Sequence, residues 1–342
     1  MTVPTRCSSS GAMAVRAAPE PVSAGDRWQR RHLLDVADLA PAELAQLLER
    51  AEYFARFVEE RHGGGLALRG RRVSLLFAEP STRTRVSFEI AARNLGADVL
   101  VLDPERSSLV KGESLPDTAR TLAAVGTDVL VLRHHRSGAP WVAARHFEGS
   151  VVNAGDGWHA HPTQALLDLF TLRRAFAAED LRGRKIAIVG DLRHSRVARS
   201  NVWSLTAAGA QVWACGPAEL LRGFDQLARS LPGDRRLTLT TDLDAALAEA
   251  DAVMALRIQF ERMDRDALSM AQYISRYQLT EERMCGARPG AFFLHPGPVN
   301  EGIEVSREVA RGPRSLVLEQ VRNSVPVRMA VLSLLLRENR PG

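Results

Sequence analysis

The sequence has almost no lysine: of its 45 basic residues, only Lys111 and Lys185 are not arginine. So strong a skew reflects a GC-rich genome better than a surface selected to follow nucleic-acid phosphates. The basic residues are also scattered among 40 acidic ones instead of forming a run. A nucleic-acid-binding function is therefore disfavoured despite the formal charge of +5, because the clustered footprint is missing. Lys111, a lysine that persists under this skew, becomes a functional candidate.

Cysteine and long apolar runs are also scarce. Cys7, Cys215 and Cys285 lie far apart and form no CxxC pair, which disfavours a disulfide framework and a structural zinc site and suits a reducing compartment. Cys215 follows an apolar stretch and is predicted to be a small buried side chain. No apolar run approaches the roughly 18–20 residues that a membrane span requires. We therefore expect a cytoplasmic protein with no membrane segment and no metal.

Residues 1–26 are rich in Ala, Ser, Pro and Arg and lack the apolar region of a secretory signal. An organellar transit peptide has a similar composition. Because the arginine bias of the whole chain already explains the basic character, we favour a disordered leader over residues 1–30, or a start at Met13.

Short apolar strands alternate with helical segments along the rest of the chain. Strands are expected at 72–77, 98–102, 128–132, 185–189, 211–214, 251–256 and 291–294. This alternation predicts an α/β fold of two doubly wound parallel-sheet domains, with the active site in the crevice between them. We place the first domain at 31–168 and the second at 169–322, followed by a C-terminal helix over 323–342 that packs back toward the first domain.

Hydroxyl and guanidinium groups cluster after the strand at 72–77. The segment Ser81-Thr82-Arg83-Thr84-Arg85 stands where a helix begins, and a helix N-terminus presents unpaired N–H groups and a partial positive charge. An ordinary N-cap is the alternative, but a cap needs one such side chain, not several in series. The segment therefore predicts an anion site.

This segment, followed by Ser87-Phe88-Glu89, resembles the carbamoyl-phosphate signature of the aspartate and ornithine carbamoyltransferases. The resemblance continues in the family's order over roughly residues 31–338. Its other motifs are Lys111-Gly112-Glu113-Ser114, Arg133-His134, His161-Pro162-Thr163-Gln164, Ser195-Arg196-Val197, Arg257-Ile258-Gln259 and His295-Pro296-Gly297-Pro298. Each motif stands at a strand end or in a loop. The family reaction, attack of an amine on carbamoyl phosphate with loss of phosphate, needs no cofactor.

The resemblance implies a role for each group at the phosphate end. The phosphate would be held by Ser81, Thr82, Arg83 and Thr84. Arg133, at the end of a strand, would bridge the phosphate and the carbonyl oxygen, to which Thr84 and His161 would donate. Removing one hydrogen-bond donor aimed at such an oxygen typically raises the activation free energy by about 3–4 kcal/mol. The catalytic residues would thus be Arg83, Thr84, Arg133 and His161.

The carbamoyl NH2 group needs acceptors rather than cations. By resemblance, these are the side chain of Gln164 and the backbone carbonyl of Gly297 or Pro298. His161 and Gln164 stand at i and i+3 around a helix start, so both can reach one substrate. A lone histidine there would be structural, as we expect for His134, His135 and His159. The departing phosphate can accept the proton of the amine, so the family chemistry needs no separate base.

The second half of the chain indicates which amine is the acceptor. The loop at 190–196 lacks the second and third glycines of G-x-G-x-x-G, which disfavours NAD. Arg196 and Arg257, with Gln259, suit the two carboxylates of L-aspartate. Either arginine alone would fit a surface ion pair. Thr163 and Pro298 also match the aspartate branch of the family, whose reaction is an early step of pyrimidine (UMP) biosynthesis.

The resemblance has implications for assembly and motion as well. The loop at 107–114 with Lys111 would enter the active site of a neighbouring subunit, giving a homotrimer with shared sites, which could join regulatory or other pyrimidine-pathway subunits. Glu79 and Arg262 would latch the two domains closed. Glu301 departs from the family pattern, which has arginine there, and it would oppose anionic substrates if it faced the site. A silent scaffolding homologue and a carbamoyltransferase for another amino acid are the competing hypotheses.

Overall fold

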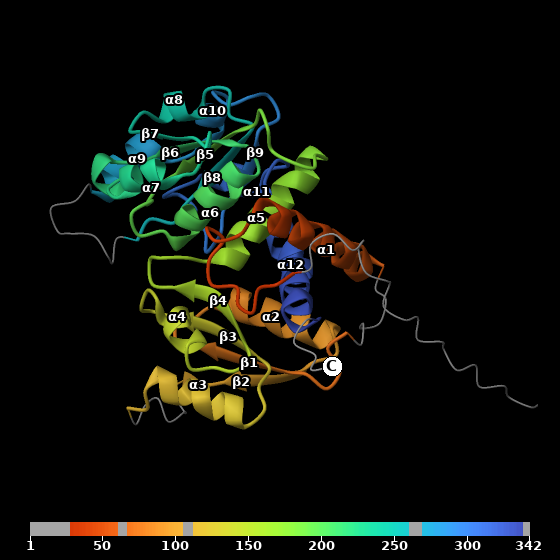
Figure 1. The fold of residues 1–342 in the computed structure, drawn as a ribbon. Helices are drawn as coiled ribbons and strands as arrows, with labels where there is room; N and C mark the ends of the chain where they lie inside the picture. Colours follow the sequence, from red (N-terminus) through yellow and green to blue (C-terminus); the bar gives the residue numbers. More distant parts are fainter. Residues whose placement is uncertain (1–27, 61–66, 105–111, 260–268, 338–342) are drawn as a thin grey trace, which may run out of the picture.

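The computed structural model describes residues 28–60, 67–104, 112–259 and 269–337. These residues form two parallel sheets, one above the other in Figure 1, with helices connecting them along one side. The predicted α/β fold with two doubly wound parallel-sheet domains is therefore confirmed. Of the leader predicted over residues 1–30, residues 1–27 lie outside the described residues. The predicted boundary at residue 30 is too late, because Trp28 is buried and Arg30 pairs with Glu43.

The first sheet has the strand order β2-β1-β3-β4. Its strands are β1 (Arg72–Phe77), β2 (Asp98–Leu102), β3 (Val129–His134) and β4 (Ser150–Asp156). The connecting helices are α2 (Thr82–Asn94), α3 (Leu115–Ala124) and α4 (Ala139–Ala144), and α1 (Pro41–Glu59) precedes the sheet. From β1 the chain first adds β2 on one side and then crosses to add β3 on the other, so the order of strands reverses between β1 and β3. The crevice for a ligand lies beyond the carboxyl ends of these two strands.

The second sheet has the order β7-β6-β5-β8-β9. Its strands are β5 (Lys185–Val189), β6 (Gln211–Cys215), β7 (Leu237–Thr240), β8 (Ala252–Ala255) and β9 (Phe292–Leu294). Around it lie α6 (Arg196–Ala207), η3 (Ala218–Leu220), α7 (Phe224–Ser230), α8 (Leu243–Leu247), α9 (Met270–Tyr277), α10 (Glu281–Met284) and α11 (Arg307–Arg311). The reversal here falls between β5 and β8.

Helices pack on both faces of the central strands, where alternate residues point to opposite sides. In β1, Val73 and Leu75 pack in the core shared with α1, α2 and α12, whereas Leu76 packs against α3 and α4. In β5, Ile186 faces α6 and Ala187 faces the α8 side. Strands buried on both faces read as continuous apolar runs, which is why most of them were predictable.

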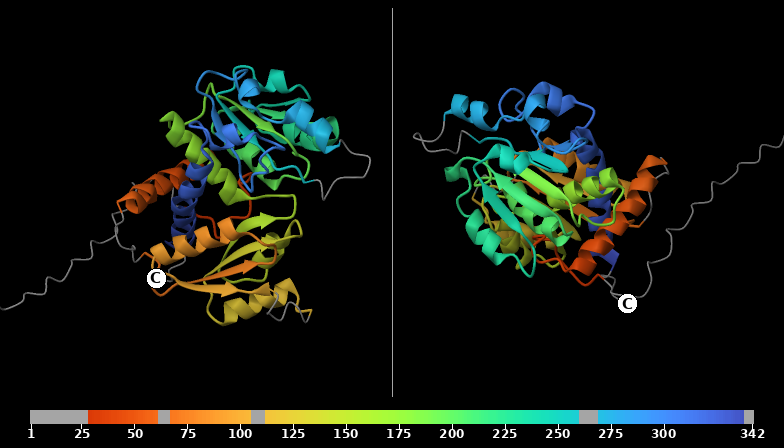
Figure 2. Two further views of the ribbon diagram at one scale, coloured as in Figure 1. Left: turned by 180° about the vertical axis from the view of Figure 1, so that it is seen from behind. Right: turned by 90° about the horizontal axis from the view of Figure 1, so that it is seen from above.

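Two long helices hold the halves together. α5 (Pro162–Phe176) leads from the first sheet to the second and packs against α6, and α12 (Val317–Arg337) packs against α1, α2 and α5. In the rear and top views of Figure 2, α12 again lies beside α1. The C-terminal helix thus begins in the second half of the chain and ends against the first domain.

Several elements differ from the sequence prediction. The structure adds β4 and β7 and the short helices α4 and α7 to α11, none of which we predicted. The last helix begins at Val317 rather than at residue 323, with Pro326 inside it. Within the described ranges, no helix is both long enough and apolar enough to cross a lipid bilayer.

Candidate active site

A cavity of about 570 Å³ opens between the two domains. Its lining includes every predicted site residue that the structure describes: Glu79, Ser81, Thr82, Arg83, Thr84, Arg133, His161, Gln164, Arg196, Arg257, Gln259, Gly297 and Pro298. Lys111 and Arg262 lie outside the described residues. Residues separated by more than 200 positions in the sequence therefore meet in one site.

The strand order explains this convergence. The segment that follows β1 carries the phosphate cradle, and Arg133 lies at the end of β3. The segments that follow β5 and β8 carry Arg196 and Arg257. These are the two reversal points of the sheets, where parallel α/β folds place their ligands. α5 begins between these points at Pro162, with His161 as its N-cap residue.

The phosphate cradle is the N-terminus of α2. Ser81 is the N-cap residue, yet within the described segment its hydroxyl makes no capping hydrogen bond. The Ser81 and Thr82 hydroxyls and the first N–H groups of α2 are therefore available to an anion. The ordinary-cap alternative for Ser81 does not hold in the structure.

The Arg83 guanidinium lies against the backbone of Gly297, another residue of the cavity lining. A Cβ atom built on Gly297 would come within 2.4 Å of the Arg83 guanidinium carbon, and the residue has φ +69. The backbone conformation favours glycine here, and a Cβ atom would displace the Arg83 guanidinium. This contact fixes the guanidinium between the cradle and the loop that carries Pro298.

Arg133 and Arg196 converge on one carboxylate, Glu79. Arg133 donates to Glu79 Oε1 at 2.6 Å, and Arg196 donates to both Glu79 oxygens. Burial alone would raise the pKa of Glu79, but the hydrogen bonds and charges of the two arginines outweigh it and hold that pKa below its usual range. Glu79, from the first domain, thus joins the predicted phosphate arginine to the predicted aspartate arginine.

Gly155 makes room for this pair of arginines. A Cβ atom there would lie 3.0 Å from Arg133 Nη1 and 3.1 Å from Arg196 Nε. Arg133 also donates to the carbonyl of Ala154 and Arg196 to that of Gly157, at 3.3 and 3.1 Å. The end of β4, a strand that we did not predict, and Gly157 directly after it therefore position both guanidinium groups.

His161 is buried at the floor of the cavity. Burial lowers the pKa of its imidazole well below the usual value, and the charges of Arg133, Arg196 and Arg328 lower it further. The ring is therefore neutral. Its Nδ1 has no hydrogen-bond partner among the described residues, and its backbone N–H donates to Ser200 Oγ at 2.9 Å. A neutral imidazole in this position can donate to a carbonyl oxygen without adding charge.

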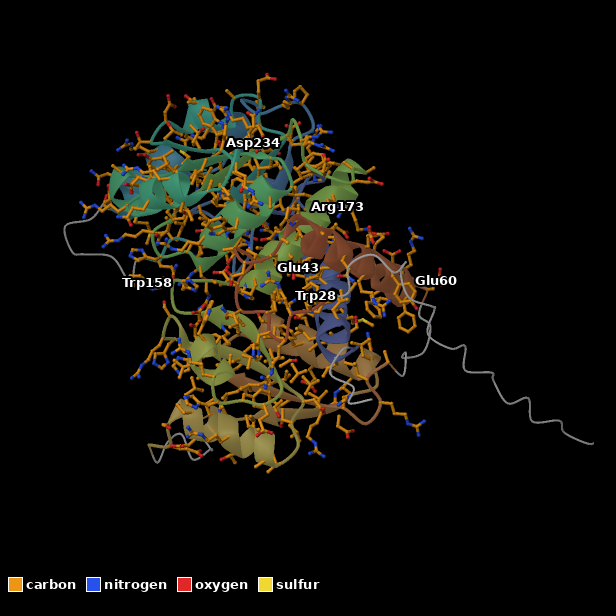
Figure 3. All side chains as sticks on the ribbon, viewed as in Figure 1. Trp28, Glu43, Glu60, Trp158, Arg173 and Asp234 are labelled. Carbon is orange, nitrogen blue, oxygen red and sulfur yellow. The ribbon has the colours of Figure 1, made fainter. Side chains whose placement is uncertain are left out.

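The second-domain side of the cavity carries Arg257 and Gln259. The Gln259 side chain donates to the His194 carbonyl at 3.0 Å, and its backbone N–H donates to Asp191 Oδ2 at 3.3 Å. The ring of His194 bonds to Asp191 and packs edge-on against Trp158, with ring centroids 4.7 Å apart. Figure 3 shows Trp158 at the level between the two domains, on the side away from α1 and α12.

Some lining residues escaped the sequence prediction, chiefly Arg328, His194 and Gln320. Arg328, on α12, is buried, and its guanidinium lies 4.9 Å from the ring of Phe88. Burial lowers its pKa to about 9, although the charge of Asp168 opposes that change. An arginine inside the apolar C-terminal half of α12 was the available signal, since charged residues are seldom fully buried unless they are paired.

The remaining predictions concern residues that do not line the cavity. Glu301 is exposed and pairs with Arg311 at 2.7 Å, so the charge reversal does not face the site. His134 and His135 stack on each other, and His159 contacts Asp35 and Asp156. Cys215 is buried, which raises the pKa of its thiol to about 12 and keeps it protonated.

Family models match both halves of the chain. Residues 31–174 match the carbamoyl-P binding domain of aspartate/ornithine carbamoyltransferases, and residues 182–335 match the Asp/Orn binding domain. The aspartate carbamoyltransferase catalytic subunit of Chloroflexus aggregans is 48% identical over 305 residues, covering 89% of this chain and 97% of that protein. The catalytic subunit of Synechococcus sp. is 50% identical over 331 residues, covering 90% and 94%.

Solved structures of aspartate and ornithine carbamoyltransferases also match the chain. Aspartate transcarbamoylase from Trypanosoma cruzi, in complex with N-(phosphonacetyl)-L-aspartic acid, matches with TM-score 0.77 and 30% identity over 89% of this chain and 95% of that one. Ornithine carbamoyltransferase from Thermus thermophilus matches with TM-score 0.75 and 30% identity over 90% and 100%. The chain therefore belongs to the aspartate/ornithine carbamoyltransferase family.

Proposed function

We propose that the chain transfers the carbamoyl group of carbamoyl phosphate to the amine of L-aspartate, giving N-carbamoyl-L-aspartate and phosphate. The observation that carries this proposal is the single cavity that joins the cradle at Ser81–Thr84 to Arg257 and Gln259. Curated relatives at 45–50% identity are aspartate carbamoyltransferase catalytic subunits, which supports aspartate as the acceptor. The reaction is an early step of pyrimidine biosynthesis.

The first domain binds carbamoyl phosphate. The phosphate sits on the N-terminus of α2 with Ser81, Thr82, Arg83 and Thr84, where the helix dipole and N–H groups favour an anion. Arg133 bridges a phosphate oxygen and the carbonyl oxygen. The neutral His161 and the Thr84 hydroxyl donate to that carbonyl oxygen, which becomes negative as the amine attacks.

The second domain binds aspartate through Arg257, Gln259 and Arg196. Arg196 is held by Glu79, and it reaches an aspartate carboxylate once that ion pair rearranges. Because Glu79 also accepts from Arg133, aspartate binding changes the ion pairs of Arg133 and Arg196 at once. Arg262 would join Glu79 in this closure, and closure excludes water from the reacting atoms. The amine proton leaves with the phosphate, which is the nearest basic group.

We further propose that the active unit is a homotrimer with shared sites. β2 is an edge strand whose Leu100 and Val101 are 38% and 41% exposed, and Val86 and Ile90 on the adjoining α2 are similarly exposed. An exposed apolar edge of this kind favours pairing with another subunit. In the trimer Lys111 reaches a neighbour's cavity. We place the enzyme in the cytoplasm, where the thiols of Cys215 and Cys285 stay reduced.

The direct experiment is incubation of the purified chain with carbamoyl phosphate and single amino acids, followed by assays for the ureido product and for phosphate. L-Aspartate should give both products in equal amounts, and ornithine should give neither above background. Absence of ureido product with aspartate would refute the proposed activity. Equal rates with ornithine would refute the assignment of Arg196 and Arg257 to the two carboxylates.

A further inference from the structure

A buried carboxylate lies directly beneath the carbamoyl end of the cavity. Asp168 stands one turn after Gln164 on α5 and is fully buried. Its Oδ1 accepts from Gln164 Nε2 at 2.9 Å and from Gln320 Nε2 at 2.7 Å. Its Oδ2 accepts from Asn201 Nδ2 at 2.8 Å. Three amide side chains, from α5, α6 and α12, therefore point their nitrogen atoms at one acid.

This arrangement determines which way each amide faces. An ionised carboxylate can only accept hydrogen bonds, so an amide beside it must present NH2 rather than oxygen. Gln164 lines the cavity, and with its nitrogen held by Asp168 its oxygen is turned to the ligand. A glutamine side chain without such a partner could present either group, because the two orientations have the same shape.

The same acid reaches the second predicted acceptor through Gln320. With its nitrogen on Asp168, Gln320 turns its oxygen to the backbone N–H of His295, at 3.0 Å. The ring of His295 in turn accepts from the Gly297 N–H at 2.8 Å. The loop that carries the Gly297 and Pro298 carbonyls is thus anchored on Asp168 by three successive hydrogen bonds, through Gln320 and His295.

We propose that Asp168 is a positioning residue that makes the site selective for a carbamoyl group, because it holds the Gln164 oxygen and the 297–298 carbonyls as acceptors for the ligand NH2. An acyl phosphate with CH3 in place of NH2 leaves these acceptors without a donor, which costs binding energy. This inference rests on the proposed function. It adds a residue that does not line the cavity itself.

The test uses two stable ligands of the same shape. Phosphonoacetamide carries NH2 where acetonylphosphonate carries CH3, and both present a phosphonate to the cradle. Calorimetry gives the affinity of each for the full chain. The ratio of the two affinities isolates recognition of the NH2 group, because any change in the cradle affects both ligands alike.

Asp168→Leu replaces both oxygens with methyl groups on the same branched skeleton, and Asp168→Ala leaves space for water, which accepts and donates equally. In both variants the preference for phosphonoacetamide should fall roughly tenfold, the effect of one buried hydrogen bond lost. The affinity for acetonylphosphonate should stay within about twofold of the unmodified chain, since the cradle is unchanged. Circular dichroism identifies which of the variants are folded.

Two matched variants separate positioning from general damage. Asp168→Asn keeps one oxygen for Gln164 and Gln320 while Asn201 can turn its own oxygen inward, so most of the preference should remain. Asn201→Ala removes the partner of Oδ2 and leaves the Oδ1 bonds in place. It should lower the melting temperature without changing the ratio of affinities.

An unchanged ratio in a folded Asp168→Leu or Asp168→Ala variant would overturn the inference, and so would an equal loss of both ligands. The unmodified chain keeps this result separate from the proposed function. If it forms no carbamoyl aspartate, the proposed function fails. If it forms the product while the Asp168 variants keep the preference, only the role of Asp168 fails.

Discussion

Arg257 lies on the second-domain side of the cavity, whereas the phosphate cradle belongs to α2 in the first domain. Arg257→Ala should therefore raise the KM for aspartate by roughly a hundredfold, the usual effect of losing a carboxylate-binding guanidinium. Carbamoyl phosphate affinity should change little. Steady-state kinetics and calorimetry measure the two effects. Arg307→Ala, an exposed arginine of the same domain, is the matched control, and equal losses of both affinities would contradict the division of roles.

Asp168 should also give the protein a measurable pH dependence of stability. Burial raises its pKa to about 6, and its neighbouring charge is Arg328. The folded state then binds a proton between about pH 4 and pH 6 that the unfolded state does not, so stability falls as pH rises through this window. Above it, the penalty is about 3 kcal/mol. Asp168→Asn has no such titration.

The check is a series of melting temperatures from pH 8 to pH 4.5 for the unmodified chain and for Asp168→Asn. The difference between them should shift in favour of the unmodified chain as the pH is lowered through 6. Parallel curves would show that Asp168 does not titrate in this range, and the acid would then have an ordinary pKa.

Some residues of the site could be predicted from the sequence, and others could not. Ser81, Arg133, His161 and Arg257 were predictable because each stands at a strand end or a helix start, where parallel α/β folds bind ligands. Asp168 and Arg328 were not predicted, since neither stands at a strand end or a helix start. Their function depends on partners such as Gln320, 152 residues from Asp168, which no local pattern indicates.

At the scale of elements, the loop at 295–298 and the helix α2 depend on each other through one close contact. Gly297→Ala would bring a Cβ atom within 2.4 Å of the Arg83 guanidinium, so Arg83 must leave its position. Carbamoyl phosphate affinity should fall roughly tenfold or more, because one charged phosphate contact is lost. Phosphate binding by calorimetry measures this change.

Gly302→Ala provides the control for the same loop region. Gly302 also has a left-handed backbone, with φ +89, but a Cβ atom there meets nothing within 4 Å. It should therefore cost a similar amount of stability without weakening phosphate binding. If both variants weakened binding equally, backbone strain rather than the Arg83 contact would be responsible.

The elements themselves were predictable in proportion to their hydrophobic pattern. Strands such as β1 and β5 are buried on both faces and appear as apolar runs. β4 ends in the polar sequence Asn-Ala-Gly-Asp and β7 alternates Leu with Thr, so neither gives that signal. The helices α8, α10 and α11 have five residues or fewer, too short for a helical period to show.

At the scale of the whole molecule, the exposed edge at β2 predicts self-association. Leu100→Asp should disrupt the trimer, because a charge at an apolar edge opposes pairing with another subunit. Light scattering should give three times the 37.5 kDa chain mass for the unmodified protein and a smaller mass for the variant. Val142→Asp, on α4 with a similar exposure of 40%, should leave the trimer intact. A monomeric unmodified chain would refute the proposed assembly.

The central claim is that one cavity holds both substrates side by side, with the phosphate on α2 and the dicarboxylate on the β8 side. N-(phosphonacetyl)-L-aspartate combines a phosphonate with an aspartate moiety, and calorimetry can compare it with phosphonoacetamide and succinate. A ligand that spans both halves should bind more tightly than either fragment by a factor of roughly a hundred or more. One site per chain is expected. An affinity no greater than that of the better fragment would show that the two halves do not form a single site.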